Sequence, residues 1–297
     1  SGIDYTHEDI SSNIWINSGE DINSNGVIDE SDFNAVDDDE NGYIDDIRGY
    51  DFVNDYPDAN AERIEGEDYI TKDNDPEDIL SHGTNVAGVI AAVTNNPEGI
   101  AGVCWTCKIM NLRVGYGYYL IDREGRPTLT GSAVDNSVAE AIRYAVDHGA
   151  KVISMSMGTS SESLTQKAAL EYATDNDVTL IAAAGNSNID TIEYPAGYNN
   201  VISVGAVDQN NKKADFSNYG YWIDIAAPGK DILTTMSTKS PINNLRYDFV
   251  DGTSVAVPYI SGIVGLLLSK NDNLKPEEIK WIIKNSVDSI DDDVYVG

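Results

Sequence analysis

Stretches typical of buried strands alternate with helical stretches along most of this chain, and this alternation constrains the fold more than any other feature. Runs of small and apolar residues at 152–156, 179–184 and 201–207 are each long enough for one buried strand. Residues 134–146 and 161–175 carry apolar side chains at helical spacing. Strands that alternate with helices predict an α/β fold of three layers, in which helices cover both faces of a doubly wound, mainly parallel sheet.

Three finer expectations complete this outline. The helix at 161–175 should place Leu164, Ala168 and Tyr172 on one face. Residues 255–269 are apolar on all sides, which predicts a buried helix. Residues 115–131 are interpreted as an extended surface loop.

The negative charge of the chain is concentrated near its amino-terminal end. The sequence contains 50 acidic and 19 basic residues, a formal net charge of −31. This charge excludes a nucleic-acid binder that works through its net field and argues against an anionic membrane as partner. Residues 1–80 hold 25 acidic and 3 basic side chains, so 22 of the 31 excess charges lie in about a quarter of the chain. We interpret this concentration as local cation binding. The apolar runs are too short to predict a membrane span.

Two acidic stretches have the spacing of an EF-hand calcium loop. In residues 21–32, oxygen-bearing side chains occupy positions 1, 3, 5, 9 and 12, and glycine occupies position 6. Residues 37–48 begin in the same way but end in Arg48, which cannot close a loop in the standard manner. Residues 72–78 are a third candidate. The alternative is a set of solvated turns that bind no ion. The predicted Ca²⁺ ligands are Asp21, Asn23, Asn25, the carbonyl of Val27, Asp29, Asp32, Asp37, Asp39, Asn41, Asp73 and Asp75.

Three separate segments carry residues suited to acyl transfer. His82 stands at the mouth of a small-residue helix, and Asn186 follows the strand at 179–184. Ser254 begins the apolar helix, where free backbone N–H groups point outward. A serine placed there can attack a carbonyl while N–H groups face the developing negative charge. Taken singly, each has an ordinary explanation, namely a core or surface histidine, a turn asparagine and a helix-capping serine.

Together these segments resemble the subtilisin-like serine proteases (subtilases, the peptidase S8 family). The family motif His-Gly-Thr-His-Val-Ala-Gly reads His-Gly-Thr-Asn-Val-Ala-Gly at 82–88. The family motif Gly-Thr-Ser-Met-Ala-x-Pro reads Gly-Thr-Ser-Val-Ala-Val-Pro at 252–258, and Ala-Ala-Gly-Asn is intact at 183–186. The resemblance extends over essentially the whole chain, in the family's order.

The resemblance implies a role for each of these residues. Ser254 would be the nucleophile, His82 the general base and then acid, and Asn186 the side-chain donor to the oxyanion. Glu193 would lie at the back of the pocket for the substrate side chain before the cleaved bond (P1), where a carboxylate favours Lys or Arg. The residues implied to bind substrate are Ser154, Ser156, Met157, Gly158, Ala184 and Glu193.

The family's aspartate motif, Asp-Ser/Thr-Gly-Ile/Val, matches the first residues Ser1-Gly-Ile without its Asp. We therefore expect the catalytic Asp, and the core strand that carries it, immediately before Ser1. The end at 295–297 falls short of the family pattern as well. These features predict one catalytic domain, 1–297, truncated at both ends, with an acidic calcium-loop insertion at 20–80. The chain as it stands should be inactive and poorly folded.

Cys104 and Cys107 are the only cysteines. Zinc would need two more ligands, and a thioredoxin-like motif would begin a helix, whereas this one leads into a strand. A local disulfide on a surface turn is expected, with two free thiols as the alternative.

These observations favour a secreted, monomeric, calcium-stabilised serine endopeptidase that acts on proteins or peptides. The alternative is an inactive, calcium-dependent protein-binding module derived from a protease. An α/β-hydrolase is excluded because no Gly-x-Ser-x-Gly surrounds Ser254.

Overall fold

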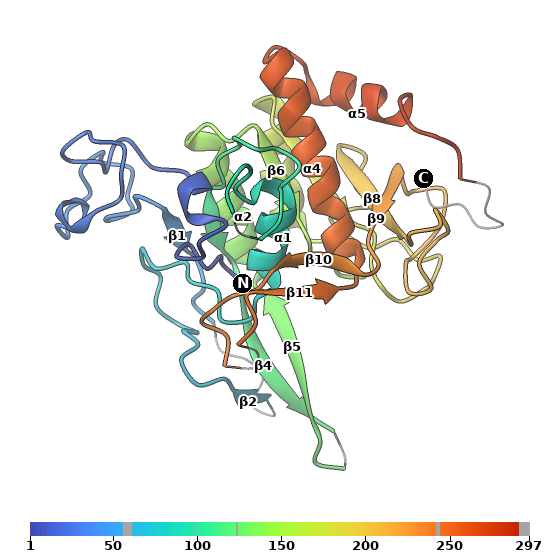
Figure 1. Ribbon diagram of the computed structural model, residues 1–297, viewed down its shortest axis with the longest axis horizontal. Coiled ribbons are helices and arrows are strands. Elements are labelled where there is room, and N and C mark those ends of the chain that lie inside the picture. Colours follow the sequence, from blue (N-terminus) through green and yellow to red (C-terminus); the bar gives the residue numbers. More distant parts are fainter. Residues whose placement is uncertain (56–60, 98, 123, 242–243, 291–297) are drawn as a thin grey trace.

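The centre of the computed structural model is a parallel sheet (Figure 1). The structure describes residues 1–55, 61–97, 99–122, 124–241 and 244–290; residues 295–297, where a break was expected, lie outside this part. Four strands run parallel in the order β6 (Val152–Met155), β7 (Thr179–Ala183), β8 (Val201–Val207) and β9 (Ile225–Pro228). A second parallel pair joins β1 (Gly49–Asp51) to β3 (Asn111–Arg113). The predicted strands and their parallel arrangement are thus confirmed.

Helices cover both faces of the four-stranded sheet. They are α1 (His82–Ala91), α2 (Asp135–Asp147), α3 (Leu164–Asp175), α4 (Thr253–Lys270) and α5 (Pro276–Lys284). Because successive side chains of a strand point to opposite faces, Leu180 and Ala182 of β7 pack in the cluster with α2 and α3. Ile181 and Ala183 pack in the cluster with α4 and α5. The predicted three-layer α/β architecture follows from this alternation.

Helix α4 is apolar on all sides, as its sequence indicated. It is long and apolar enough to cross a membrane by length and composition, and half of it is buried in the protein. It packs against α1 and against strands β6 to β9. The buried half of its apolar surface is therefore core, whereas Ile263 (40% exposed) and Leu266 (44%) face solvent, so the helix is less buried than its sequence predicted.

One local expectation was wrong. Residues 115–131 are mostly a hairpin, formed by β4 (Gly115–Ile121) and β5 (Pro127–Ala133), with β2 (Ala61–Arg63) alongside β4. Tyrosines with high strand propensity alternate with glycines there, and Tyr116 packs against Tyr69. Leu164, Ala168 and Tyr172 share one face of α3, as expected, and that face points outward, since Leu164 is 80% exposed.

The remaining elements are small. A hairpin of β10 (Ile232–Thr235) and β11 (Tyr247–Val250) packs beside α1, and the short 3-10 helices η1 (Ser11–Asn13) and η2 (Glu30–Asp32) lie in the amino-terminal part. Arg113 of β3 ties that part to the core, because its guanidinium binds the carboxylates of Asp51 and Glu67. All three side chains are at most 3% exposed.

Candidate active site

His82 and Ser254 both stand at the beginning of a helix, and these two helices pack together. His82 is the first residue of α1 and Ser254 the second residue of α4. Asp78, which the sequence did not single out, holds the first turn of α1. Its carboxylate accepts hydrogen bonds from the backbone N–H groups of Leu80 (2.9 Å), Ser81 (3.1 Å) and Thr84 (2.9 Å). This buried cap fixes the point from which His82 projects.

His82 reaches solvent at the edge of a cavity of about 1210 Å³ that extends between β3 and β6. Partial desolvation against the cavity wall lowers the pKa of its imidazole below the usual value of a histidine. A histidine with a lowered pKa is neutral at pH 7 and can accept a proton. Ser1 is held nearby, because its Oγ accepts a hydrogen bond from the N–H of Gly83 (2.9 Å).

Asn186 lies next to the nucleophile candidate. Its Oδ1 accepts hydrogen bonds from the backbone N–H of Thr253 (2.8 Å) and from Thr253 Oγ1 (2.9 Å). The amide nitrogen is thereby left pointing away from Thr253. A Cβ atom placed on Gly252 would lie 3.6 Å from Asn186 Nδ2 and 3.8 Å from Ser254 Cβ. The amide donor and the serine thus flank the same point at the start of α4.

The residues implied to bind substrate divide into two groups. Ser154, Ser156, Met157 and Gly158 line the same cavity as His82. Ser156 Oγ donates to the backbone oxygen of Ser254 (2.7 Å) and Ser154 Oγ accepts from Ser261 Oγ (3.0 Å), so both hydroxyls join β6 and its extension to α4.

Ala184 and Glu193 form the second group. The side chain of Ala184 is fully buried. Glu193 Oε2 would lie 2.9 Å from a Cβ atom on Gly158 and 2.6 Å from one on Gly185. Two glycines therefore make room for this carboxylate, whose Oε1 accepts from Asn218 Nδ2 (3.2 Å).

The two predicted calcium loops share one backbone turn. In the first, Asp21 accepts hydrogen bonds from the N–H groups of Asn25 (3.1 Å) and Gly26 (2.7 Å). In the second, Asp37 accepts from the N–H groups of Asn41 (3.0 Å) and Gly42 (2.8 Å). In both loops, the side-chain oxygen of the asparagine at position 5 accepts a hydrogen bond of 2.7 Å from the backbone N–H two residues later. The two loops, which their residue spacing predicted to be equivalent, therefore have the same backbone hydrogen bonds.

Other predicted ligands are not brought together in this way. Asp73 accepts the N–H of Asp75 (2.9 Å), and Asp75 accepts the hydroxyl of Tyr5 (2.7 Å). Within the described ranges, one group of three carboxylates has its oxygens close enough to share an ion: Glu20, Asp39 and Asp46. Only Asp39 of these was predicted. The sequence showed the acidic run at 37–46 but not that Glu20 folds onto it.

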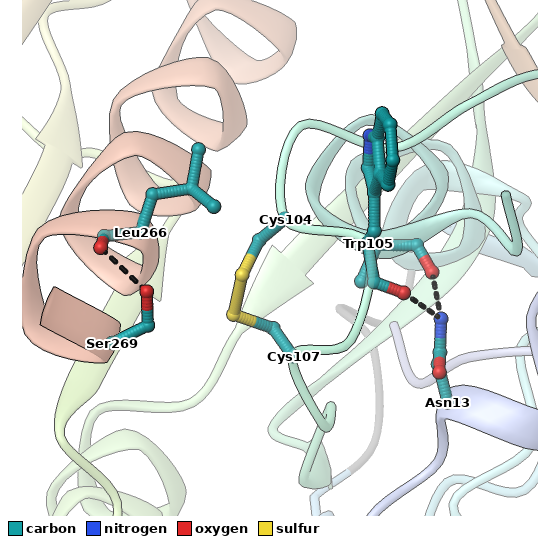
Figure 2. The surroundings of a disulfide bond; sticks show 7 residues. Asn13, Cys104, Trp105, Cys107, Leu266 and Ser269 are labelled. Atoms are coloured by element: carbon teal, nitrogen blue, oxygen red, sulfur yellow. Dashed lines mark hydrogen bonds between the residues drawn. A yellow bond between two sulfur atoms is a disulfide. The ribbon is translucent and has the colours of Figure 1, made fainter.

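Cys104 and Cys107 form a disulfide, as expected, with Cα atoms 5.4 Å apart. Figure 2 shows the bond facing α4. A Cβ atom on Gly265 of α4 would lie 2.7 Å from Cys107 Sγ. Cys104 is only 2% exposed, so this turn is packed against the core helix on one side. On the other side, Asn13 Nδ2 donates to the backbone oxygen of Trp105 (3.3 Å).

Comparison with known proteins agrees with this geometry. The model of the subtilase family matches residues 1–295. A thermophilic serine proteinase from Bacillus sp. (strain AK1) is 41% identical over 79% of this chain and 54% of its own length, so the chain spans about half of that relative. Thermitase from Thermoactinomyces vulgaris is 38% identical over 79% of this chain and 77% of its own length.

Among solved structures, a protease from Pseudoalteromonas arctica has a TM-score of 0.68 and 30% identity, covering 82% of this chain and 77% of that one. The similarity therefore holds in sequence and in three dimensions, over nearly the whole chain in the case of the family model. This chain belongs to the subtilase family.

Proposed function

We propose that this chain is the catalytic part of a secreted serine endopeptidase, with Ser254 as nucleophile, His82 as general base and Asn186 as oxyanion donor. One observation carries the proposal. Thr253 holds the side-chain carbonyl of Asn186, so that the amide nitrogen lies close to Ser254 at the start of α4. The relatives' names as serine proteinases support the same activity. The chain would act as one catalytic unit, with residues 20–80 as an acidic insertion.

The chemistry follows from these positions. Ser254 Oγ attacks the carbonyl carbon of the peptide bond while His82 takes the hydroxyl proton. Negative charge then develops on the former carbonyl oxygen, where Asn186 Nδ2 and the free N–H groups of the first turn of α4 stabilise it. His82 returns the proton to the departing amine, and water completes the cycle by the same steps in reverse.

We propose an aspartate as the third member of the triad, joined to the amino group of Ser1 in the whole protein. Ser1 lies next to the first turn of α1, because its Oγ accepts a hydrogen bond from the N–H of Gly83, the residue after His82. A residue attached there would reach the imidazole. Its carboxylate would orient His82 and stabilise the imidazolium, a role worth about 10⁴ in kcat in other triads.

Labelling with a fluorophosphonate tests the activity directly. The full-length protein should take up one equivalent of label, and mass spectrometry should place that label on Ser254. Ser254→Ala is the control and should take up no label. Absence of label from folded wild-type protein would support the alternative, a calcium-dependent protein-binding module. The retention of Ser254, His82 and an anchored Asn186 together favours the enzyme.

Glu193 supports a preference for Lys or Arg at P1. Its carboxylate occupies the space that the missing side chains of Gly158 and Gly185 leave open. A basic side chain that reached this carboxylate would form a charge-assisted hydrogen bond, which is stronger than a neutral one.

We also propose that Ca²⁺ stabilises the protein. The residues present fit the ion, because Asp32 Oδ1 is buried and has no hydrogen-bond partner in the described part of the chain. In the first loop the ion would be held by Asp21, Asn23, Asn25, the carbonyl of Val27, Asp29 and Asp32, and in the second by Asp37, Asp39 and Asn41. Bound calcium supplies positive charge among crowded carboxylates. The disulfide is consistent with secretion, since such bonds persist in oxidising surroundings.

A further inference from the structure

Glu20, Asp39 and Asp46 come from three places in the acidic segment and converge on one point. One carboxylate oxygen of each lies within 4.8 Å of the other two. Glu20 and Asp46 are 0% exposed. Three acidic groups so close together repel one another. Burial strengthens the repulsion between Glu20 and Asp46, which water screens less than it screens the more exposed Asp39.

Hydrogen bonds from the described residues satisfy these three carboxylates only in part. Glu20 Oε1 accepts the N–H groups of Asp38 (2.8 Å) and Asp39 (3.3 Å), but Glu20 Oε2 is buried without a hydrogen-bond partner among the described residues. The Asn17 side-chain amide donates to Asp39 (3.0 Å) and to Asp46 (2.7 Å). A buried carboxylate oxygen with no donor is costly, which makes it rare in native proteins.

The unpartnered oxygen belongs to the same three-carboxylate group, so it marks a place for a positive ligand. The three groups thus disfavour being ionised together without a counter-charge. All donors are oxygens, the ligand type that hard divalent cations prefer.

We propose that Glu20, Asp39 and Asp46 together bind one Ca²⁺ ion, with Glu20 closing the second loop from outside it. Ca²⁺ takes oxygen ligands at about 2.3–2.6 Å, so ligands on opposite sides of one ion lie up to about 5 Å apart. The separation of these oxygens fits that limit. Arg48 occupies the position where a standard loop has its closing carboxylate. This inference extends the calcium part of the proposed function and does not depend on catalysis.

The site is joined to the core through α2. The hydroxyl of Tyr144 donates to Asp46 Oδ2, and Asn41 Nδ2 donates to the same oxygen (3.0 Å). Tyr144 is 2% exposed and meets Tyr43 and Phe52 edge to face. An ion here would fasten the acidic segment, which projects as blue loops in Figure 1, onto the aromatic side of α2.

Calcium titration calorimetry on chelator-treated full-length protein tests this inference. Glu20→Gln removes one charge and keeps the shape of the side chain. Glu40→Gln is the matched control, because Glu40 is an exposed residue of the same loop outside the three-carboxylate group. Glu20→Gln should bind one Ca²⁺ fewer than wild type, and Glu40→Gln should bind the wild-type number. Both counts are independent of peptidase activity.

Thermal melting separates ion binding from a purely structural role. In chelator, Glu20→Gln should melt at or above the wild-type temperature, because the repulsion is relieved. In calcium the order should reverse. The inference is overturned if Glu20→Gln binds as many ions as wild type with the same affinity. It is also overturned if the variant melts below wild type by the same margin in chelator and in calcium.

Discussion

The proposed oxyanion donor, Asn186, offers the sharpest test, because two hydrogen bonds from one residue orient it. Thr253 donates to Asn186 Oδ1 from its backbone N–H and from its hydroxyl, so Thr253→Val removes one of the two anchors. A neutral hydrogen bond contributes about 0.5–1.5 kcal/mol. If that energy is lost only in the transition state, kcat falls about 2- to 12-fold and KM is unchanged. Asn186→Ala removes the donor itself and should lower kcat about 10²- to 10³-fold.

The double variant decides whether Thr253 acts through Asn186. If it does, Thr253→Val lowers kcat little further once Asn186 is alanine, so the two effects on kcat are not additive. The hydrogen bond from the Gly185 N–H to the Thr253 hydroxyl (3.2 Å) is lost in both backgrounds. Thr253→Ser keeps the hydroxyl and should stay within about 2-fold of wild type on the same energy scale. The assay is steady-state cleavage of a chromogenic peptide by the full-length protein, with melting temperature as a check on folding. Equal costs of Thr253→Val in both backgrounds would refute the reasoning.

Three further predictions concern other parts of the molecule. Arg113→Met leaves two buried carboxylates unpaired and should lower the free energy of unfolding by about 3–5 kcal/mol in denaturant titrations. The loss should be smaller at pH 5 than at pH 8: burial raises the folded-state pKa of Asp51 to about 7, above its unfolded value, so the folded state is destabilised as pH rises through it. Glu193→Gln should reduce kcat/KM for P1 Arg peptides about 10-fold or more and leave P1 Phe peptides nearly unchanged; equal effects on both would exclude the P1 role. Gly265→Ala should lower the melting temperature, because the new methyl group meets Cys107 Sγ at 2.7 Å.

Local sequence signals were sufficient where burial and spacing determine structure within one element. The all-buried runs predicted β7 and β8, and the motifs at 82–88 and 252–258 lie at the starts of α1 and α4, two helices that pack together. The hairpin of β4 and β5 was missed because its glycines suggested a loop, whereas tertiary packing of Tyr116 favours a strand. The spacing also gave no sign that α3 turns Leu164 to solvent.

The calcium loops show more clearly which features local sequence signals do not predict. Their internal spacing predicted a shared turn, which the backbone has. Glu20 precedes the first loop and carries no spacing signal, yet it folds against the N–H groups of Asp38 and Asp39. Which acidic side chains become buried depends on contacts between distant segments, and a single sequence does not contain that information.

The hydrogen bond from Ser156 to the backbone of Ser254 sets a rule for redesign. The edge proposed to receive substrate is hydrogen-bonded to the proposed nucleophile, so we expect substitutions at 156–158 to alter selectivity and turnover together. A directed-evolution library aimed at selectivity alone should vary the surroundings of Glu193. Asn218 holds that carboxylate, so changes there should leave α4 in place.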